Sequence, residues 1–204
     1  MQLIGRYLSP YVRRVAIWCA LQGREVENLP LPVMGAGDTE AIRDFHPGRR
    51  VPVLVLDDGT KLVDSWAICD WLDDTAPEGR RFIPATGVAR RDGLQRMALA
   101  QAASEKAVAL VYDNNRRPEE YHWPEWQERL RDQIRGSFSA LEALVPDAGF
   151  FGGDAPDGAD IAAVCAYHFA FVTNPDVVDG RFPKLAALAE RAMDVPAFRE
   201  TYPG

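Results

Sequence analysis

Ser9 carries the side chain that this sequence places best for chemistry. It follows a short apolar run and is followed at once by Pro10, after which apolar residues recur at helical spacing. Serine is a preferred helix N-cap, and proline suits the first helical position because its missing N–H would be unpaired there anyway. The pattern predicts a strand-to-helix junction, where backbone N–H groups and the helix dipole would stabilise an anion such as a thiolate. The alternative is that Ser9 is only a cap.

Two further stretches offer groups that could join Ser9 in one site. Pro52 stands in the β-branched run 51–56, where a proline removes a ladder hydrogen bond. A cis Val51–Pro52 bond would turn the backbone N–H and C=O of Val51 outward, whereas a trans proline at a strand start is the ordinary alternative. Asp64 and Ser65 precede another helical pattern. There Ser65 could cap the helix and Asp64 could accept from an ammonium group, or the two could be a simple capping pair.

The first part of the chain alternates between strand and helix patterns. Strand–helix–strand units imply a parallel pair, and the turn signal Asp57-Asp58-Gly59 implies an antiparallel hairpin. These patterns predict a small mixed sheet with helices on its faces. The expected strands are 2–7, 26–31, 51–56 and 61–63, the expected helices are 10–22, 38–45 and about 66–72, and residues 34–37 are expected to form a loop.

The strand patterns end at a segment rich in proline and glycine, which we interpret as a linker over about 79–86. Beyond it, helices are expected at 88–113, 124–144, 158–173, 183–193 and 196–201. The pattern of 158–173 is apolar on all sides, which is typical of a buried helix. Asp157 and Asp160 resemble a capping box at its start. The sequence thus predicts an α/β domain over 1–78 and an all-α domain over 87–204.

Composition excludes several classes of function. The 204 residues carry a formal net charge of −7, and neither half is basic, so a general nucleic-acid surface is not expected. There is no signal-peptide pattern and no apolar run of membrane-spanning length. Cys19, Cys69 and Cys165 lie far apart in apolar helical patterns without metal-ligand spacing, so we expect buried free thiols, no metal and a cytoplasmic location.

Four short motifs follow one another along the chain. They are Ser-Pro-Tyr-Val-Arg-Arg-Val from Ser9, Arg-Val-Pro-Val-Leu from Arg50, Asp-Ser at 64–65, and Gly-Asp-Ala-Pro-x-x-Ala-Asp-Ile ending at Ile161. In this order and spacing they resemble the cytosolic glutathione transferase family over nearly the whole chain. The resemblance implies a thioredoxin-like first domain (βαβαββα) that binds glutathione. It also implies an all-helical second domain that walls the site for an electrophile.

The resemblance assigns roles at the first strand-to-helix junction. Ser9 matches the catalytic serine of the family. Tyr7 is the alternative, since other classes of the family use a tyrosine near the end of the first strand. Tyr7 would share the strand parity of Ser9, but Ser9 fits the helix-cap geometry better.

The other assigned residues would hold glutathione. Pro52 matches the family's cis-proline, beside which the backbone of Val51 would pair with the cysteinyl part of glutathione. Asp64 and Ser65 match the pair that holds the γ-glutamyl group. Arg50 falls where several serine-type classes have a lysine that faces the glycyl carboxylate. The sequence departs from the family at Asp157, where a serine or threonine cap is usual.

The implied activity is conjugation of the glutathione thiolate to small electrophiles, as in detoxification, by a cytoplasmic homodimer. Two alternatives stay open: a glutathione-dependent isomerase, dehalogenase or peroxidase, and a non-catalytic protein that binds glutathione or a partner. Candidates for the second-substrate pocket are Tyr11, Val108 and Tyr112, although core packing is an alternative role for all three.

Overall fold

The computed structural model describes residues 1–33 and 38–203, so the loop expected at 34–37 lies outside the described residues. The chain divides into two compact units. The first comprises Met1–Phe82 together with Val195–Pro203, and the second is helical and comprises Ile83–Asp194. Sequence patterns had grouped the last residues with the helical domain. They belong to the first unit because Arg13 donates to the carbonyl oxygen of Phe198 at 2.9 Å and to Thr201 Oγ1 at 3.3 Å.

The first unit has the predicted mixed sheet. Strands β1 (Gln2–Ile4) and β2 (Glu27–Leu29) are parallel, while β3 (Val53–Val55) is antiparallel to β1 and to β4 (Lys61–Val63). The strand order is β2-β1-β3-β4. The hairpin and the parallel pair are therefore confirmed. Each strand except β4 is shorter than expected.

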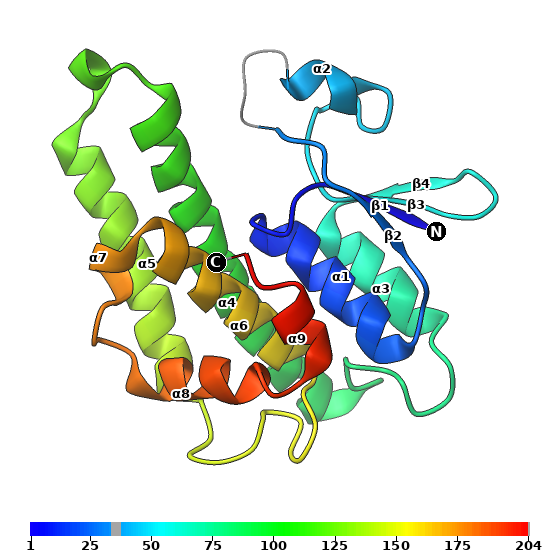
Figure 1. Ribbon diagram of the computed structural model, residues 1–204. Helices are drawn as coiled ribbons and strands as arrows, with labels where there is room; N and C mark the ends of the chain where they lie inside the picture. The colour runs from blue at the N-terminus through cyan, green and yellow to red at the C-terminus, as the bar shows by residue number, and fades with distance from the viewer. Residues whose placement is uncertain (34–37, 204) are drawn as a thin grey trace. The chain divides into compact units, whose positions relative to one another are not determined.

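Helices α1 (Pro10–Gln22) and α3 (Ser65–Asp74) lie side by side on one face of the sheet, away from α2 (Asp38–Arg43), as Figure 1 shows. Their apolar faces and β1 and β3 form the core of this unit. Its members include Leu3, Ile4, Val12, Ile17, Trp18, Val53, Leu54, Ile68 and Leu72, all at most 1% exposed. Helix α9 (Pro196–Glu200) packs against α1. The bounds predicted for the first helix are confirmed.

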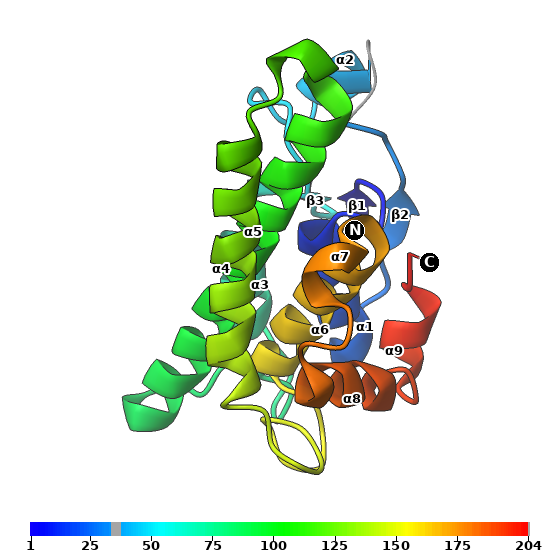
Figure 2. The ribbon, with the colours of Figure 1, turned by 90° about the vertical axis from the view of Figure 1, so that its left-hand side faces the viewer.

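The second unit is all helical among its described residues. The long helices α4 (Gly87–Arg116) and α5 (Pro124–Glu142) pack side by side, as both ribbon views show (Figure 2). Helix α6 (Gly158–Thr173) packs against α4, α7 (Pro175–Val178) and α8 (Pro183–Ala192). Its residues from Gly158 to Ala170 are all buried, as the apolar pattern predicted.

Two single-turn elements were not predicted. The 3₁₀ turn η1 (Glu119–Tyr121) is closed by the N–H of Tyr121 donating to the carbonyl of Pro118, and α7 ends with Asp179 N–H donating to the carbonyl of Pro175. One turn is too short to show a hydrophobic period. No helix among the described residues has the length and apolar character needed to cross a bilayer.

Candidate functional site

Three of the predicted segments leave the sheet at the same end. Ile4, the last residue of β1, pairs with Val53, the first residue of β3. Val53 also pairs with Val63, the last residue of β4. Strand register therefore brings together the segment after β1, which leads to Ser9, the segment 50–52 before β3, and the pair 64–65 after β4.

Gly5 fixes how closely these segments approach. A Cβ at this position would lie 2.6 Å from Val12 Cγ2 and 3.0 Å from Val51 Cβ, so the first turn of α1 and residue 51 both press against the same backbone. Its φ of +126° is also one that only glycine adopts readily. Sequence analysis did not identify Gly5 as a site residue. The signal it could have used is a glycine at the end of an apolar strand.

Ser9 is the N-cap of α1, as predicted. Its Oγ accepts from the N–H of Val12 at 3.4 Å, a long hydrogen bond, and Pro10 occupies the first turn. Because the oxygen is the acceptor in this bond, the cap leaves the hydroxyl hydrogen available for donation. The half-buried hydroxyl can thus serve as a cap and as a donor to an anion at the helix N-terminus.

Tyr7 lies in a turn and not in the strand. The N–H of Ser9 donates to the carbonyl of Arg6 at 3.0 Å, so the strand ends at Ile4 and the parity argument for Tyr7 is wrong. The pKa of the Tyr7 phenol is raised by burial and, less, by its Coulombic interaction with Cys19.

The Val51–Pro52 peptide bond is cis, as the resemblance implied. Pro52 is buried and Val51 is half-buried beside Gly5. Arg50 is exposed, next to Arg49, whose φ is +52° and whose guanidinium pairs with Glu40 at 3.3 Å. Arg50 is therefore positioned at the surface end of the same segment.

The capping prediction at 64–65 is corrected. Asp64, not Ser65, is the N-cap of α3, and its Oδ1 accepts from the N–H of Trp66 at 2.8 Å. Ser65 is the first helical residue and is buried, at 4% exposure. Asp64 adopts φ +69° and ψ +124°, a positive-φ conformation outside the left-handed helical region that is uncommon for any residue other than glycine. Its side chain is exposed, so the carboxylate can cap the helix and also face a cation in solvent.

The three cysteines are free and buried, as predicted. Burial raises the pKa of Cys19 to about 12, so it is a neutral thiol near pH 7. It is therefore no competing nucleophile. Among the described residues there is also no cluster of three or more His, Cys, Asp or Glu side chains arranged to hold a metal ion.

The candidates for a second-substrate pocket belong to both units. Tyr11 lies two residues after Ser9 in the first unit and is half-buried. Val108 and Tyr112 are in α4 of the second unit, one turn apart on one helical face, and Tyr112 is 40% exposed. Their joint role stays a prediction.

The chain matches two family models. Residues 3–80 match the glutathione S-transferase N-terminal domain, and residues 124–191 match the glutathione S-transferase C-terminal domain. Among curated proteins, maleylacetoacetate isomerase of Pseudomonas aeruginosa is 28% identical over 218 residues, covering 100% of this chain and 96% of that protein.

Solved structures agree in fold. A glutathione S-transferase of Methylobacterium radiotolerans, in complex with glutathione sulfonate, has a TM-score of 0.90 and 25% identity, covering 99% of this chain and 94% of that one. A glutathione transferase family member from Pseudomonas fluorescens Pf-5, with bound glutathione, has a TM-score of 0.84 and 29% identity, covering 100% and 98%.

Proposed function

Because the chain belongs to the glutathione S-transferase family, we propose that it binds glutathione at the sheet end described above and transfers the glutathione thiolate to small electrophiles. The observation that carries the proposal is the Ser9 cap. Its oxygen accepts from Val12 while its hydrogen is available to a sulfur at the N-terminus of α1. Solved structures of similar fold that hold glutathione or glutathione sulfonate support it.

The groups around Ser9 match the chemistry of glutathione. The backbone of Val51 would pair with the cysteinyl amide, and the exposed Asp64 carboxylate would face the γ-glutamyl ammonium. The first turn of α3, beginning at Ser65, would offer the positive end of a helix dipole to the γ-glutamyl carboxylate. Arg50 would approach the glycyl carboxylate. Each charge of the tripeptide would then meet a group of opposite sign.

In the proposed reaction the thiol first loses its proton to solvent, and Ser9 donates to the resulting thiolate. The sulfur then forms a bond to an electrophilic carbon. A leaving group departs with its electron pair, or, on an electron-poor alkene, the adjacent carbon takes up a proton. Ser9 remains a hydrogen-bond donor throughout and forms no covalent bond.

Ionisation alone accounts for little acceleration. If the thiol pKa falls by ~2 from ~8.5, the thiolate fraction at pH 7 rises from ~3% to ~75%, a gain of ~25-fold. A less basic thiolate is a weaker nucleophile. With a Brønsted slope of ~0.45 for log rate against thiol pKa, the reactivity of each thiolate falls ~8-fold, so the net rate gain is ~3-fold. Holding both substrates in an attack geometry must supply more. We therefore expect the proposed second-substrate residues Tyr11, Val108 and Tyr112 to contribute more to the rate than ionisation does.

A glutathione-dependent isomerase is a second candidate, favoured by the 28% identity to maleylacetoacetate isomerase along the whole chain. The same thiolate would add to a cis alkene conjugated to a carbonyl. The resulting enolate would rotate about the new single bond and expel the thiolate unchanged. Transferase and isomerase would thus share the Ser9 site and differ in the fate of the enolate.

Glutathione binding followed by calorimetry tests the proposal. No measurable binding at millimolar glutathione would refute both enzyme functions. Turnover of an aryl halide with formation of a conjugate would support the transferase, and cis–trans conversion of a maleyl-type substrate without net glutathione consumption would support the isomerase. Binding without turnover of either substrate, or of a peroxide or haloalkane, would instead support a non-catalytic protein.

The role of Ser9 has its own test. In Ser9→Ala we expect the ultraviolet thiolate absorbance of bound glutathione to shift to higher pH, whereas Ser9→Thr keeps a hydroxyl and should retain it. Affinity for S-methylglutathione, which has no thiol proton, should change little in either variant. If thiolate absorbance and turnover both survive in Ser9→Ala, Ser9 is only a helix cap.

The proposed homodimer is tested by sedimentation equilibrium of the full chain.

A further inference from the structure

Arg14 is fully buried at the start of the second turn of α1, at 0% exposure, five residues after the Ser9 cap. Removing a guanidinium from water is costly unless specific partners receive it. Two of its partners are aromatic rings: the guanidinium carbon lies 6.0 Å from the centroid of the Tyr11 ring and 5.6 Å from that of the Trp66 ring. Arginine over an aromatic face is a favourable pair, more so when desolvated.

The two rings occupy equivalent positions in the proposed glutathione site. Tyr11 follows Ser9 by two residues, and Trp66 follows Asp64 by two. The backbone N–H of Trp66 also donates to Asp64 Oδ1, at 2.8 Å. The Arg14 side chain therefore contacts a neighbour of each cap residue, one in the first turn of α1 and one in the first turn of α3.

We infer that Arg14 is a positioning residue, an inference that rests on the proposed glutathione site. It holds the first turns of α1 and α3 against each other, and so keeps Ser9 and the Asp64–Ser65 pair at the spacing that glutathione spans. Glutathione would contact Ser9 and Asp64 directly and Arg14 only through them. A planar guanidinium suits this role because it stacks on rings, which the ammonium of a lysine does not do.

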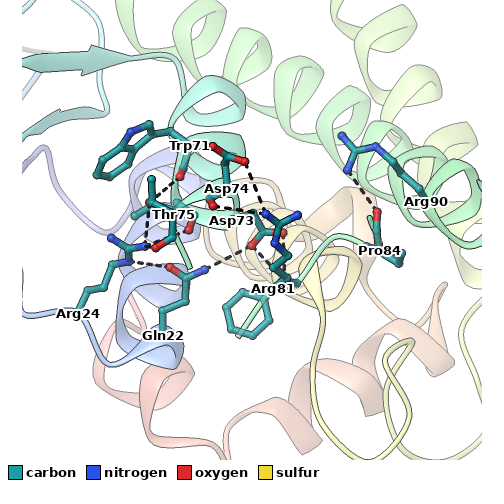
Figure 3. Close-up of polar contacts among 11 residues, drawn as sticks. Gln22, Arg24, Trp71, Asp73, Asp74, Thr75, Arg81, Pro84 and Arg90 are labelled. Carbon is teal, nitrogen blue, oxygen red and sulfur yellow. Dashed lines mark hydrogen bonds and ion pairs between the residues drawn. The ribbon is translucent and has the colours of Figure 1, made fainter. Parts of the chain in front are cut away.

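The same two helices carry a second arginine–tryptophan pair at their other ends. Arg24, just beyond α1, lies 5.5 Å from the Trp71 ring centroid and donates to the carbonyls of Leu72 and Thr75 at 3.1 and 2.7 Å. Figure 3 shows Arg24 beside Gln22, Trp71 and Thr75. Because this pair closes the C-terminal ends of the helices, it joins the same elements far from the proposed ligands. Arg24 is therefore a matched control for Arg14.

The experiment compares Arg14→Lys with Arg24→Lys. Both variants should lower the unfolding midpoint, since each loses a stacked guanidinium. We expect the glutathione Kd to rise about tenfold in Arg14→Lys and by less than about twofold in Arg24→Lys. The kcat at saturating glutathione should change less than the Kd, because the displaced ligand groups are still present. A purely structural role for Arg14 would lower the midpoint and leave the Kd unchanged, which would overturn the inference.

A second variant pair keeps both arginines in place. Trp66→Phe weakens the stacking face near the site, and Trp71→Phe does the same at the other end. We expect about threefold weaker glutathione binding in Trp66→Phe and no change in Trp71→Phe. Equal Kd values in these two variants would also overturn the inference. If the wild-type chain does not bind glutathione, the proposed function fails. If the wild type binds glutathione and Arg14→Lys and Trp66→Phe bind it with the same Kd, only the role of Arg14 is refuted.

Discussion

Helices α1 and α6 both begin at a predicted cap residue, but they differ in how many backbone N–H groups at the N-terminus have side-chain acceptors. We call the N-terminus of α6 the closed cap, because several of these groups are satisfied, and that of α1 the open cap. At α6, Asp157 Oδ1 accepts from the N–H groups of Ala159 and Asp160 at 2.7 and 3.1 Å. The Asp160 carboxylate in turn accepts from three N–H groups, those of Phe151, Gly152 and Asp157. At α1, the Ser9 side chain accepts from a single N–H among the described residues, that of Val12 at 3.4 Å.

The difference separates a structural N-terminus from one suited to a ligand. Backbone donors satisfied within the chain stabilise the fold but have nothing to offer an anion. A hydroxyl that only accepts a hydrogen bond can still donate its own hydrogen to a ligand atom such as a sulfur. The two caps should therefore respond differently to mutation: α6 in stability, and α1 in activity.

The largest expected effect is at the closed cap. Asp160→Ala removes the acceptor of three partly buried N–H groups, and each unsatisfied group costs about 1–3 kcal/mol, so we expect a loss of about 4 kcal/mol in the free energy of unfolding. Urea unfolding of the full chain measures it. The exposed Asp154→Ala is the control and should change stability by less than about 0.5 kcal/mol. A loss below about 1 kcal/mol in Asp160→Ala would contradict the closed-cap interpretation.

Each cap also has a glycine pressed against it, and the two can be compared. A Cβ at Gly5 would meet Val12 Cγ2 at 2.6 Å, and one at Gly152 would meet the carbonyl oxygen of Ala155 at 2.5 Å. We expect Gly5→Ala to cost about 3 kcal/mol, because its φ of +126° adds strain, and Gly152→Ala to cost about 2 kcal/mol.

Only Gly5→Ala should weaken glutathione binding, because the added Cβ would also lie 3.0 Å from Val51 Cβ. Calorimetry below the unfolding transition of both variants tests this. Equal glutathione affinities in Gly5→Ala and Gly152→Ala would remove the proposed distinction between the two caps.

The closed cap should also make stability depend on pH. Burial raises the pKa of Asp160 to about 7, with a smaller contribution from the nearby Asp157 carboxylate. The folded chain then binds more protons than the unfolded chain between about pH 4 and pH 7, so this group's contribution to stability is full below about pH 4 and is lost as the pH rises through 7.

Comparison with Asp160→Asn, which lacks this titration, isolates the effect. We expect the stability gap between the wild type and Asp160→Asn to be largest near pH 4 and to narrow toward pH 7. Denaturant unfolding at pH 4.5, 6 and 8 measures the gap. A gap that stays constant or widens with pH would show that the three N–H donors outweigh the cost of burying the charge.

The smallest expected effect on stability is at the open cap. Ser9→Ala should cost about 0.5 kcal/mol, since its single bond is long, whereas Asp157→Ala should cost about 2 kcal/mol. Activity should reverse this order. If Ser9→Ala raises the thiol pKa by ~2, kcat/KM falls ~10-fold at pH values below both pKa values. Above them both thiols are ionised, so the deficit disappears and the more basic thiolate of the variant becomes the faster nucleophile. A pH-independent loss would contradict thiolate stabilisation by Ser9.

Several features were predictable because they depend on residues close in sequence. Ser9-Pro10 marked the start of α1 and Gly23 its end, and the structure has the helix over Pro10–Gln22. Asp157 and Asp160 are three residues apart and form the predicted capping box. Cap bonds and helical periods span three or four residues, so the local sequence determines them.

The site was predictable only in part. Ser9 and the 64–65 pair were identified as cap positions, but which residue of the pair caps α3 was predicted wrongly. Asp64 takes the cap because its Oδ1 accepts from the N–H of Trp66 at 2.8 Å, which leaves Ser65 as the first helical residue. The cis bond at Pro52 came from the family resemblance, since base rates for the residues alone favour trans.

By itself, then, the sequence determined where the helices begin, which face of each is apolar, and that a hydroxyl stands at a helix N-terminus. Only the tertiary structure decided that Val12 and Val51 leave no room for a Cβ at Gly5, that Arg13 binds the last residues of the chain, and that Arg14 lies against Trp66. These contacts join residues far apart in the chain. Their formation depends on strand register and helix packing, which no local pattern of residues encodes.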